Sequence, residues 1–296
     1  MVFYNRRFNA LGADRVVAEL CELVSRHRID EVSLLDSNFL VDIRRAVAIA
    51  QGILNSGMRF SWTFQASTDF VCRMTDQQVG LLAASGLSHI GFGTESASPE
   101  VLAWMEKRHQ KVEDMYEAAD RCRRAGIQVT FNLIFGYPGE EDRHRRETLR
   151  VMSDLSQRFE NTTFSPNLFT PYPGIPIWPQ LRELGMLEPQ CLAEWAKIDL
   201  GANNLPWLPG KAFRKLDRGI RYFTLYNGVN RRWKHGRSSI IQRILQIVRM
   251  PLRWRLRHMY FAWPVELWAA RLRRRLVIRR SLLNGQELSD EFARSH

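Results

Sequence analysis

Cysteine is scarce in this chain of 296 residues, which contains four. They are Cys21, Cys72, Cys122 and Cys191, and they stand so far apart that no two have CxxC or CxxxC spacing. This pattern excludes a local metal-ligand cluster and argues against a disulfide framework. We therefore expect no metal site within the chain and a reducing, cytoplasmic location.

Long apolar runs are also missing. Residues 1–15 contain no apolar core of a signal peptide, and the longest uncharged stretch, residues 161–181, carries five prolines. Neither segment is suited to cross a membrane. Glycine (18) and proline (12) are too few for a collagen-like or low-complexity chain. We expect a folded protein whose contact with a membrane is peripheral, at its inner face.

Acidic residues are few in the last third of the chain. Residues 211–296 contain 21 lysines and arginines against 5 acidic residues; the chain totals of 43 and 31 leave 22 basic and 26 acidic residues in 1–210. The net charge of +12 therefore belongs to the C-terminal third. This asymmetry indicates a near-neutral body joined to a basic appendage that meets phosphate, on nucleic acid or anionic lipid. A solvated basic face is the alternative.

No acidic residue at all occurs between Arg218 and Val265. The same segment has a helical apolar stripe from Ile240 to Val248, and aromatic residues alternate with arginines from Trp254 through Arg280. Arginine and tryptophan on an amphipathic helix suit the headgroup zone of an anionic membrane. We expect residues 211–296 to bind such a surface, with nucleic acid the less favoured partner. A helical bundle that packs on the rest of the chain is an equal alternative.

Strand-like apolar runs alternate with helical patterns along residues 13–169. The runs begin near residues 32, 60, 89, 127 and 163, and their separation suits strand–helix crossovers, which force neighbouring strands to be parallel. Apolar spacing predicts helices at residues 13–26, 43–55, 76–84, 99 onward, 111–124 and 143–158. Ligands bind at the carboxyl ends of parallel strands, so we expect the site there.

Two of these strand ends carry informative residues. In Asn132–Glu140 a buried strand runs into Gly136 and a Pro-Gly turn, where backbone amides can approach a flat or anionic ligand. An ordinary turn is the alternative. In Gly91–Ser96 a carboxylate and a hydroxyl stand side by side, which suits a ribose or an amino group. A helix cap by Ser96 or Ser98 is the alternative there.

Six segments follow one another in a characteristic order: Glu31–Phe39, Trp62–Gln65, Gly93–Leu102, Ala125–Ile127, Phe135–Glu140 and Thr170–Pro176. This succession, over residues 4–188, resembles the core of a radical S-adenosylmethionine (SAM) enzyme, and most of all the branch with an N-terminal cobalamin-binding domain. The resemblance implies an α/β fold, a partial (βα)6 TIM-like barrel that lacks its first strand. We expect this barrel core over residues 1–190 and a basic, mainly α-helical C-terminal region over residues 191–296.

The resemblance also implies which residues contact the cofactor. They are Asp36, Ser37 and Asn38 near the methionine amino group, Gln65 facing the barrel interior, Glu95 and Ser96 at the ribose or methionine moiety, Ile134, Phe135 and Gly136 beside adenine, and Tyr172 on the substrate side. Three positions depart from the family pattern. Asn132 replaces the first glycine of GxIxGxxE, Glu140 comes one residue late, and Ile175 stands where threonine is common.

The cluster-binding CxxxCxxC of the family is not in this sequence; it would precede a segment like Phe3–Arg7. Cys21 and Cys122 fall in predicted helices and Cys72 stands alone, so we do not expect the chain to bind a 4Fe–4S cluster well. A fragment of a longer gene product is the favoured interpretation. A split gene, with a partner chain that supplies the missing segment, and a degenerate homologue are the alternatives.

The function implied is that of a radical SAM enzyme fragment that orients SAM for 5′-deoxyadenosyl radical chemistry. The intact family carries a 4Fe–4S cluster, and cobalamin is expected in this branch, with methyl transfer or cyclisation on a small, apolar or lipid-like substrate. Because the cluster ligands are absent, whether the chain alone is an enzyme stays open. The hypothesis from a different class is a catalytically inactive barrel that binds a phosphate surface, either anionic lipid or RNA.

Overall fold

A computed structural model describes residues 9–196, 198, 205–235 and 239–272. Tertiary contacts divide the chain into two compact units, one of residues 1–167 and 172–177 and another of residues 168–171 and 178–296. The predicted domain boundary at residue 190 stays a prediction. The segment Phe3–Arg7 and the arginines from position 273 to Arg280 lie outside the described residues.

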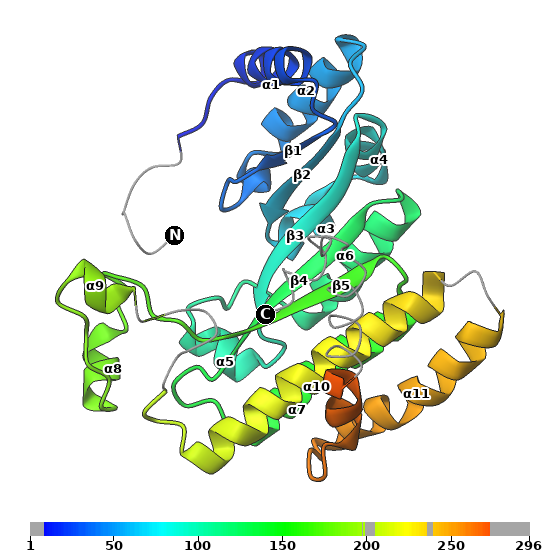
Figure 1. The fold of residues 1–296 in the computed structure, drawn as a ribbon. Helices are drawn as coiled ribbons and strands as arrows, with labels where there is room; N and C mark the ends of the chain where they lie inside the picture. Colours follow the sequence, from blue (N-terminus) through cyan, green and yellow to red (C-terminus); the bar gives the residue numbers. More distant parts are fainter. Residues whose placement is uncertain (1–8, 197, 199–204, 236–238, 273–296) are drawn as a thin grey trace, which may run out of the picture. The chain divides into compact units, whose positions relative to one another are not determined.

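The first unit is built on a parallel five-stranded sheet with the order β1-β2-β3-β4-β5. Its strands are β1 (Glu31–Leu34), β2 (Ser61–Ala66), β3 (Leu87–Glu95), β4 (Gln128–Phe135) and β5 (Thr162–Leu168). Figure 1 shows them side by side in chain order, as consecutive βα units of a barrel would lie. The predicted α/β class and its parallel strands are confirmed.

Helices precede the first strand and connect the others. They are α1 (Ala13–His27), α2 (Ile43–Asn55), α3 (Thr68–Arg73), α4 (Asp76–Ala84), α5 (Pro99–Trp104), α6 (Val112–Arg124) and α7 (Asp142–Arg158), with a short 3-10 turn η1 (Phe39–Val41) after β1. All except η1 and α3 lie where apolar spacing predicted a helix. η1 is shorter than one helical turn and α3 is shorter than two, so neither repeats an apolar stripe, whereas the equally short α5 begins at Pro99.

Alternation along the strands gives the sheet an apolar and a polar face. Trp62, Phe64, Phe92 and Phe131 are fully buried on the apolar face, and the rings of Phe92 and Phe131 stack with centroids 5.6 Å apart. Helices α4 and α6 contact β3 and β4 and run along the sheet in Figure 1. The hydrophobic core of the unit thus lies between sheet and helices, and the polar face is left for a ligand.

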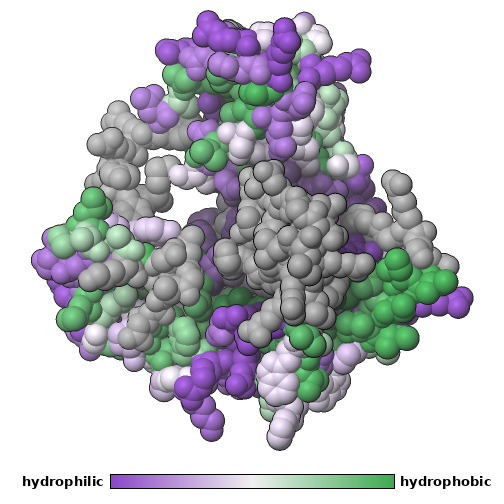
Figure 2. Space-filling view, viewed as in Figure 1, coloured by the Kyte–Doolittle hydropathy of each residue, from purple (hydrophilic) through white to green (hydrophobic). Residues whose placement is uncertain are grey.

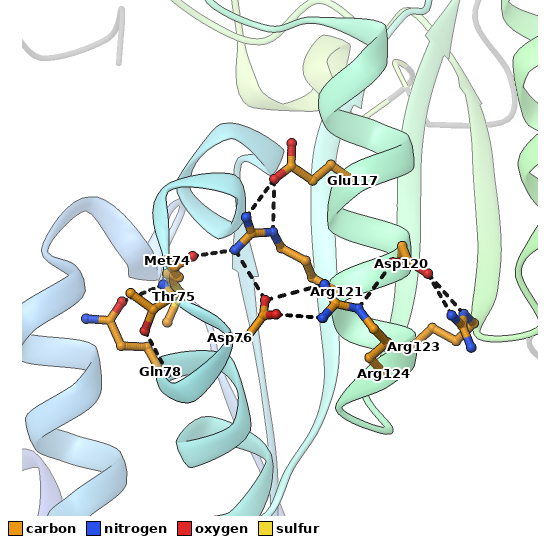
Figure 3. Close-up of polar contacts among 9 residues, drawn as sticks. All are labelled: Met74, Thr75, Asp76, Gln78, Glu117, Asp120, Arg121, Arg123 and Arg124. Atoms are coloured by element: carbon orange, nitrogen blue, oxygen red, sulfur yellow. Dashed lines mark hydrogen bonds and ion pairs between the residues drawn. The ribbon is translucent and has the colours of Figure 1, made fainter.

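A polar cluster ties α6 to the start of α4 (Figure 3). Asp76 in the first turn of α4 pairs with Arg124 of α6 at 2.6 Å and with Arg121 at 3.5 Å. Thr75 and Gln78 form a capping box, in which the Gln78 N–H donates to Thr75 Oγ1 at 3.2 Å and the Thr75 N–H donates to Gln78 Oε1 at 2.9 Å. The cluster fixes the spacing of the two helices that support β3 and β4.

The second unit is helical. It contains α8 (Trp178–Glu183), α9 (Leu192–Trp195), α10 (Gly210–His235) and α11 (Ser239–His258). Helices α10 and α11 pack against each other, and Tyr222, Tyr226, Leu252 and Leu256 are fully buried in this unit. The predicted helical character of the C-terminal part is confirmed. Among the residues that the structure describes, no helix is both long enough and apolar enough to cross a bilayer.

Candidate functional site

The polar face of the sheet is lined by side chains that bond to one another across strands. Thr63 of β2 donates to the Ser33 hydroxyl of β1 at 3.1 Å, and His89 Nε2 of β3 lies 2.8 Å from Thr130 Oγ1 of β4. Thr130 in turn lies 2.5 Å from the Thr163 hydroxyl of β5. Burial lowers the pKa of His89, which favours its neutral form. These contacts make an ordered polar floor below the carboxyl ends of the strands.

Gln65 reaches across this floor from the end of β2. A Cβ at Gly91 of β3 would come within 2.2 Å of Gln65 Oε1, so a larger residue there would displace the Gln65 amide from this position. Gln65 Oε1 also accepts from Asn132 Nδ2 of β4 at 3.4 Å. Asn132, which departs from the expected glycine, therefore orients Gln65 over β3.

Glu95 ends β3 in a strained conformation. Its φ is +59°, and the Ser96 N–H donates to the Thr94 carbonyl at 2.6 Å, which closes a γ-turn around Glu95. Backbone strain of this kind costs about 1–3 kcal/mol and concentrates at ligand sites. Glu95 Oε1 pairs with Lys107 Nζ at 2.5 Å, while Oε2 has no hydrogen-bond partner within the described part of the chain. The turn holds a mostly buried carboxylate at the carboxyl end of the sheet.

Two residues of the loop between α5 and α6 support this turn. Lys107 Nζ lies 3.5 Å from the Gly93 carbonyl as well as against Glu95, and Gln110 Nε2 donates to the same carbonyl at 2.7 Å. The Gln110 Oε1 atom is buried with no partner among the described residues. Sequence reasoning missed Lys107 and Gln110, because loop residues follow no periodicity. The polar run from Lys107 to Lys111 was the one local signal.

Ser96 and Phe135 turn away from the polar face. Ser96 is buried, and its hydroxyl lies 3.2 Å from Thr148 Oγ1 of α7 and accepts from the Ser98 N–H at 3.1 Å. Neither Ser96 nor Ser98 caps α5 through its side chain. Phe135 is buried on the apolar side of β4, whereas its neighbour Ile134 is half-buried on the polar side. Ser96 and Phe135 can therefore contact a ligand at the polar face only through their backbones.

The loop after β1 brings Asp36, Ser37 and Asn38 to the carboxyl edge of the sheet. Asp36 and Ser37 are exposed. Asn38 is half-buried, and its Oδ1 atom has no hydrogen-bond partner in the described residues. Buried acceptors of this kind are rare in folded proteins and need an explanation. Asn38 therefore keeps one acceptor that no described residue uses.

The loop after β4 is fixed by a buried ion pair. Gly136, with a φ of +81°, donates its N–H to Glu140 Oε2 at 2.5 Å, and Arg145 Nε donates to the same oxygen at 3.0 Å. The side chains of Glu140 and Arg145 are 1% and 4% exposed. Burial raises the pKa of Glu140, although the guanidinium opposes that shift. The pair holds the backbone of Gly136, the residue predicted to lie beside adenine.

The structure brings most of the predicted residues to one edge. Parallel strands in chain order place Asn38, Gln65, Glu95 and Gly136 at the same, carboxyl end of the sheet. Tyr172 is 55% exposed in the turn after β5, where its carbonyl accepts from the Ile175 N–H at 3.5 Å. The roles assigned to these residues stay predictions, with Glu95 and Asn38 distinguished by acceptors that no described residue satisfies.

The sequence profile of the Radical SAM superfamily matches residues 4–152, half of the chain. The chain belongs to the radical SAM superfamily. An uncharacterized methyltransferase of Pyrococcus horikoshii is 26% identical over 175 residues, which cover 59% of this chain and 36% of that protein. The chain thus spans about a third of the length of the curated relatives that it matches.

Solved radical SAM structures share the fold. The methyltransferase TsrM from Kitasatospora setae, with a tryptophan substrate and a SAM analogue bound, has a TM-score of 0.51 at 22% identity, over 60% of this chain and 34% of that one. The cobalamin-dependent enzyme OxsB, with aqua-cobalamin and SAM bound, has a TM-score of 0.50 at 12% identity, over 84% and 42%. At these identities the likeness shows the fold alone.

The cysteines of this radical SAM chain do not fit a 4Fe–4S cluster. Cys21, Cys72 and Cys122 lie on α1, α3 and α6, and Cys191 precedes α9. Burial raises the pKa of both Cys72 and Cys122 to about 12, whereas cluster ligands are thiolates. Across the described ranges, no three Cys, His, Asp or Glu side chains gather as metal ligands. We assign no reaction step through a cluster to these residues.

The carboxyl edge does fit SAM in its pattern of donors and acceptors. The ribose hydroxyls and the ammonium of SAM are hydrogen-bond donors, and Glu95 Oε2 and Asn38 Oδ1 are acceptors that no described residue satisfies. The half-buried Ile134 offers an apolar surface to a flat ring, next to the fixed backbone of Gly136. The edge therefore matches the polar and apolar parts of SAM with separate groups.

Proposed function

We propose that the carboxyl edge of this sheet binds SAM and orients it for radical chemistry. Glu95 carries the proposal, because its strained turn and its ion pair with Lys107 need a functional reason. Lys107 fixes one carboxylate oxygen at 2.5 Å and leaves the other to accept hydrogen bonds from the ribose hydroxyls. Lys107 acts here as a positioning residue.

The neighbouring strand ends complete the proposed contacts. Asn38 Oδ1, with the exposed carboxylate of Asp36 nearby in the chain, accepts from the methionine ammonium. Gln65, oriented by its hydrogen bond from Asn132, lies on the polar face of the sheet at the end of β2. Ile134 packs on the adenine ring. Each of these contacts joins a group of SAM to a side chain of matching chemistry.

For the complete enzyme we propose methyl transfer assisted by cobalamin. The Pyrococcus relative and TsrM are named as methyltransferases, and OxsB is named as cobalamin-dependent. A small, apolar or lipid-like substrate is part of this proposal. The cluster and cobalamin would be held by residues other than those described here. The inactive barrel that binds a phosphate surface has no support from the comparisons.

Isothermal calorimetry of SAM with the full chain tests the site. We expect weak binding to the unmodified chain, since no cluster anchors the methionine group. Glu95→Gln should lower the affinity about tenfold or more, because a hydrogen bond to a charged group contributes about 1.5–3 kcal/mol.

Glu113→Gln is the matched control, because Glu113 is an exposed glutamate on α6. It should bind SAM as the unmodified chain does, and thermal unfolding should show that both variants are folded. Equal affinity of Glu95→Gln and the unmodified chain would remove Glu95 from the site. No detectable binding to the unmodified chain would contradict the proposal as a whole.

A further inference from the structure

Helix α11 has one side that is firmly packed. Leu252 and Leu256 are fully buried, and the helix lies against α10. The Arg249 guanidinium stacks 3.7 Å from the Trp233 ring centre and donates to Asn230 Oδ1 at 3.0 Å. Both partners are on α10. The orientation of α11 about its own axis is therefore fixed within the second unit.

The opposite side of α11 is apolar too, but exposed. It carries Ile240, Ile244, Ile247 and Trp254, whose spacing places them on one helix face. We call these four residues the isoleucine ridge. Their side chains are 52–70% exposed, and Figure 2 shows hydrophobic atoms gathered where α11 lies in Figure 1. A ridge of this size on a helix already packed on its other side indicates a further contact.

The surroundings of the isoleucine ridge are basic. Arg243 and Arg257 are exposed on the same helix, and the chain has no acidic residue from position 218 to position 265. Glu266, the next acidic residue, has its carboxylate bound to Arg255 at 2.8 Å and to the Tyr222 hydroxyl at 2.9 Å. The charged residues of α11 itself are therefore all of one sign.

A highly exposed tryptophan follows α11 in a constrained turn. Trp263 is 75% exposed and has a φ of +50°. The Arg255 guanidinium donates to the carbonyls of Ala262 at 2.7 Å and Trp263 at 3.0 Å, which holds the turn in place. Tryptophan prefers the boundary between lipid headgroups and acyl chains. Because the turn is already held in place, insertion of Trp263 into a membrane interface would cost little further conformational entropy.

We infer that α11 and the turn at Trp263 form a docking surface for an anionic lipid bilayer. The isoleucine ridge would enter the headgroup–acyl boundary while Arg243 and Arg257 reach lipid phosphates beside it. This surface is independent of the proposed SAM site.

Two other occupants fit the same observations less well. A second copy of the chain could pair ridge to ridge, but it would bring arginines of like sign together, whereas paired helices match opposite charges there. RNA would satisfy the arginines but would leave the isoleucines in water. An anionic bilayer satisfies both parts of the surface.

Co-sedimentation of the full chain with vesicles tests the inference. We expect binding to phosphatidylcholine vesicles with about a third phosphatidylglycerol, and little binding to phosphatidylcholine alone. Binding should weaken as salt rises from about 0.1 M to about 0.5 M. The pair Ile244→Ser with Ile247→Ser should lower the partition coefficient roughly tenfold or more, and Arg243→Gln with Arg257→Gln should lower it by a similar factor.

The matched control is Leu187→Ser with Leu192→Ser, two leucines outside α11 that are 89% and 86% exposed. This control should change vesicle binding less than about twofold, and circular dichroism should show all variants folded. Unchanged binding by the ridge pair would overturn the inference. So would a full chain that ignores anionic vesicles, whether it shifts RNA at the same salt or forms a dimer that the ridge pair abolishes.

Discussion

At the residue scale, the buried pair of Glu140 and Arg145 is the most consequential contact of the first unit. It joins the loop after β4 to α7 and fixes the amide of Gly136 at the proposed adenine site. Glu140 could be read from the sequence as part of a strand-end motif. Arg145 could not, because it stands in the arginine-rich run 143–146 of an amphipathic helix, where arginines are normally solvated.

The substitution Arg145→Met should destabilise the chain by about 3–5 kcal/mol, because it leaves the Glu140 carboxylate buried without its counter-charge. Urea unfolding measures the change, and Arg150→Met, an exposed arginine of the same helix, is the control. The double variant Glu140→Gln with Arg145→Met should recover part of the loss. A cost below about 1 kcal/mol for Arg145→Met would show that the pair is not important to stability.

The conformation and the contacts of Glu95 could be predicted from the sequence only in part. Its place at the end of β3 was predicted from the resemblance. Its positive φ, its turn and its partner Lys107 depend on how the loop after α5 folds back on the strand. The same is true of Ser96, whose side chain bonds to Thr148, a residue 52 positions later. Distant contacts of this kind leave no local pattern.

At the element scale, periodicity predicted all five strands and the longer helices of the first unit. The parallel crossovers made this possible, since each strand is a short segment in which apolar residues recur and each covering helix has one apolar stripe. The short η1 and α3 escaped, because three and six residues do not define a stripe. Some helix N-termini are capped by side-chain hydrogen bonds and others are not, and the contribution of such a cap to stability can be measured.

Helix α4 begins with a full capping box, whereas the N-cap residue of α6, Lys111, makes no side-chain capping bond. Thr75→Ala should therefore destabilise the chain by about 1 kcal/mol, since it removes the acceptor of the Gln78 N–H. Lys111→Ala, at the corresponding position of α6, should cost clearly less. Thermal unfolding of both variants measures the difference, and equal losses would mean that the cap of α4 contributes nothing beyond helix propensity.

At the scale of the whole molecule, composition and motif order gave complementary information. The order of six short motifs pointed to the radical SAM superfamily, which the match over residues 4–152 shows. The separation of charge marked the C-terminal part as different from the rest, and its helices bear that out. The position of the candidate residues at the strand ends was predictable, but which of their side chains lie on the polar face of the sheet required the structure.

Amide hydrogen exchange of the full chain, with and without saturating SAM, tests the proposed site most directly. Bound SAM should slow exchange at the three strand ends it contacts, in residues 36–39, 93–97 and 134–137. Exchange in α1 and α11 should not change. Slowed exchange confined to other segments, or no change at the end of β3 around Glu95, would contradict the proposal that the carboxyl edge of this sheet holds SAM.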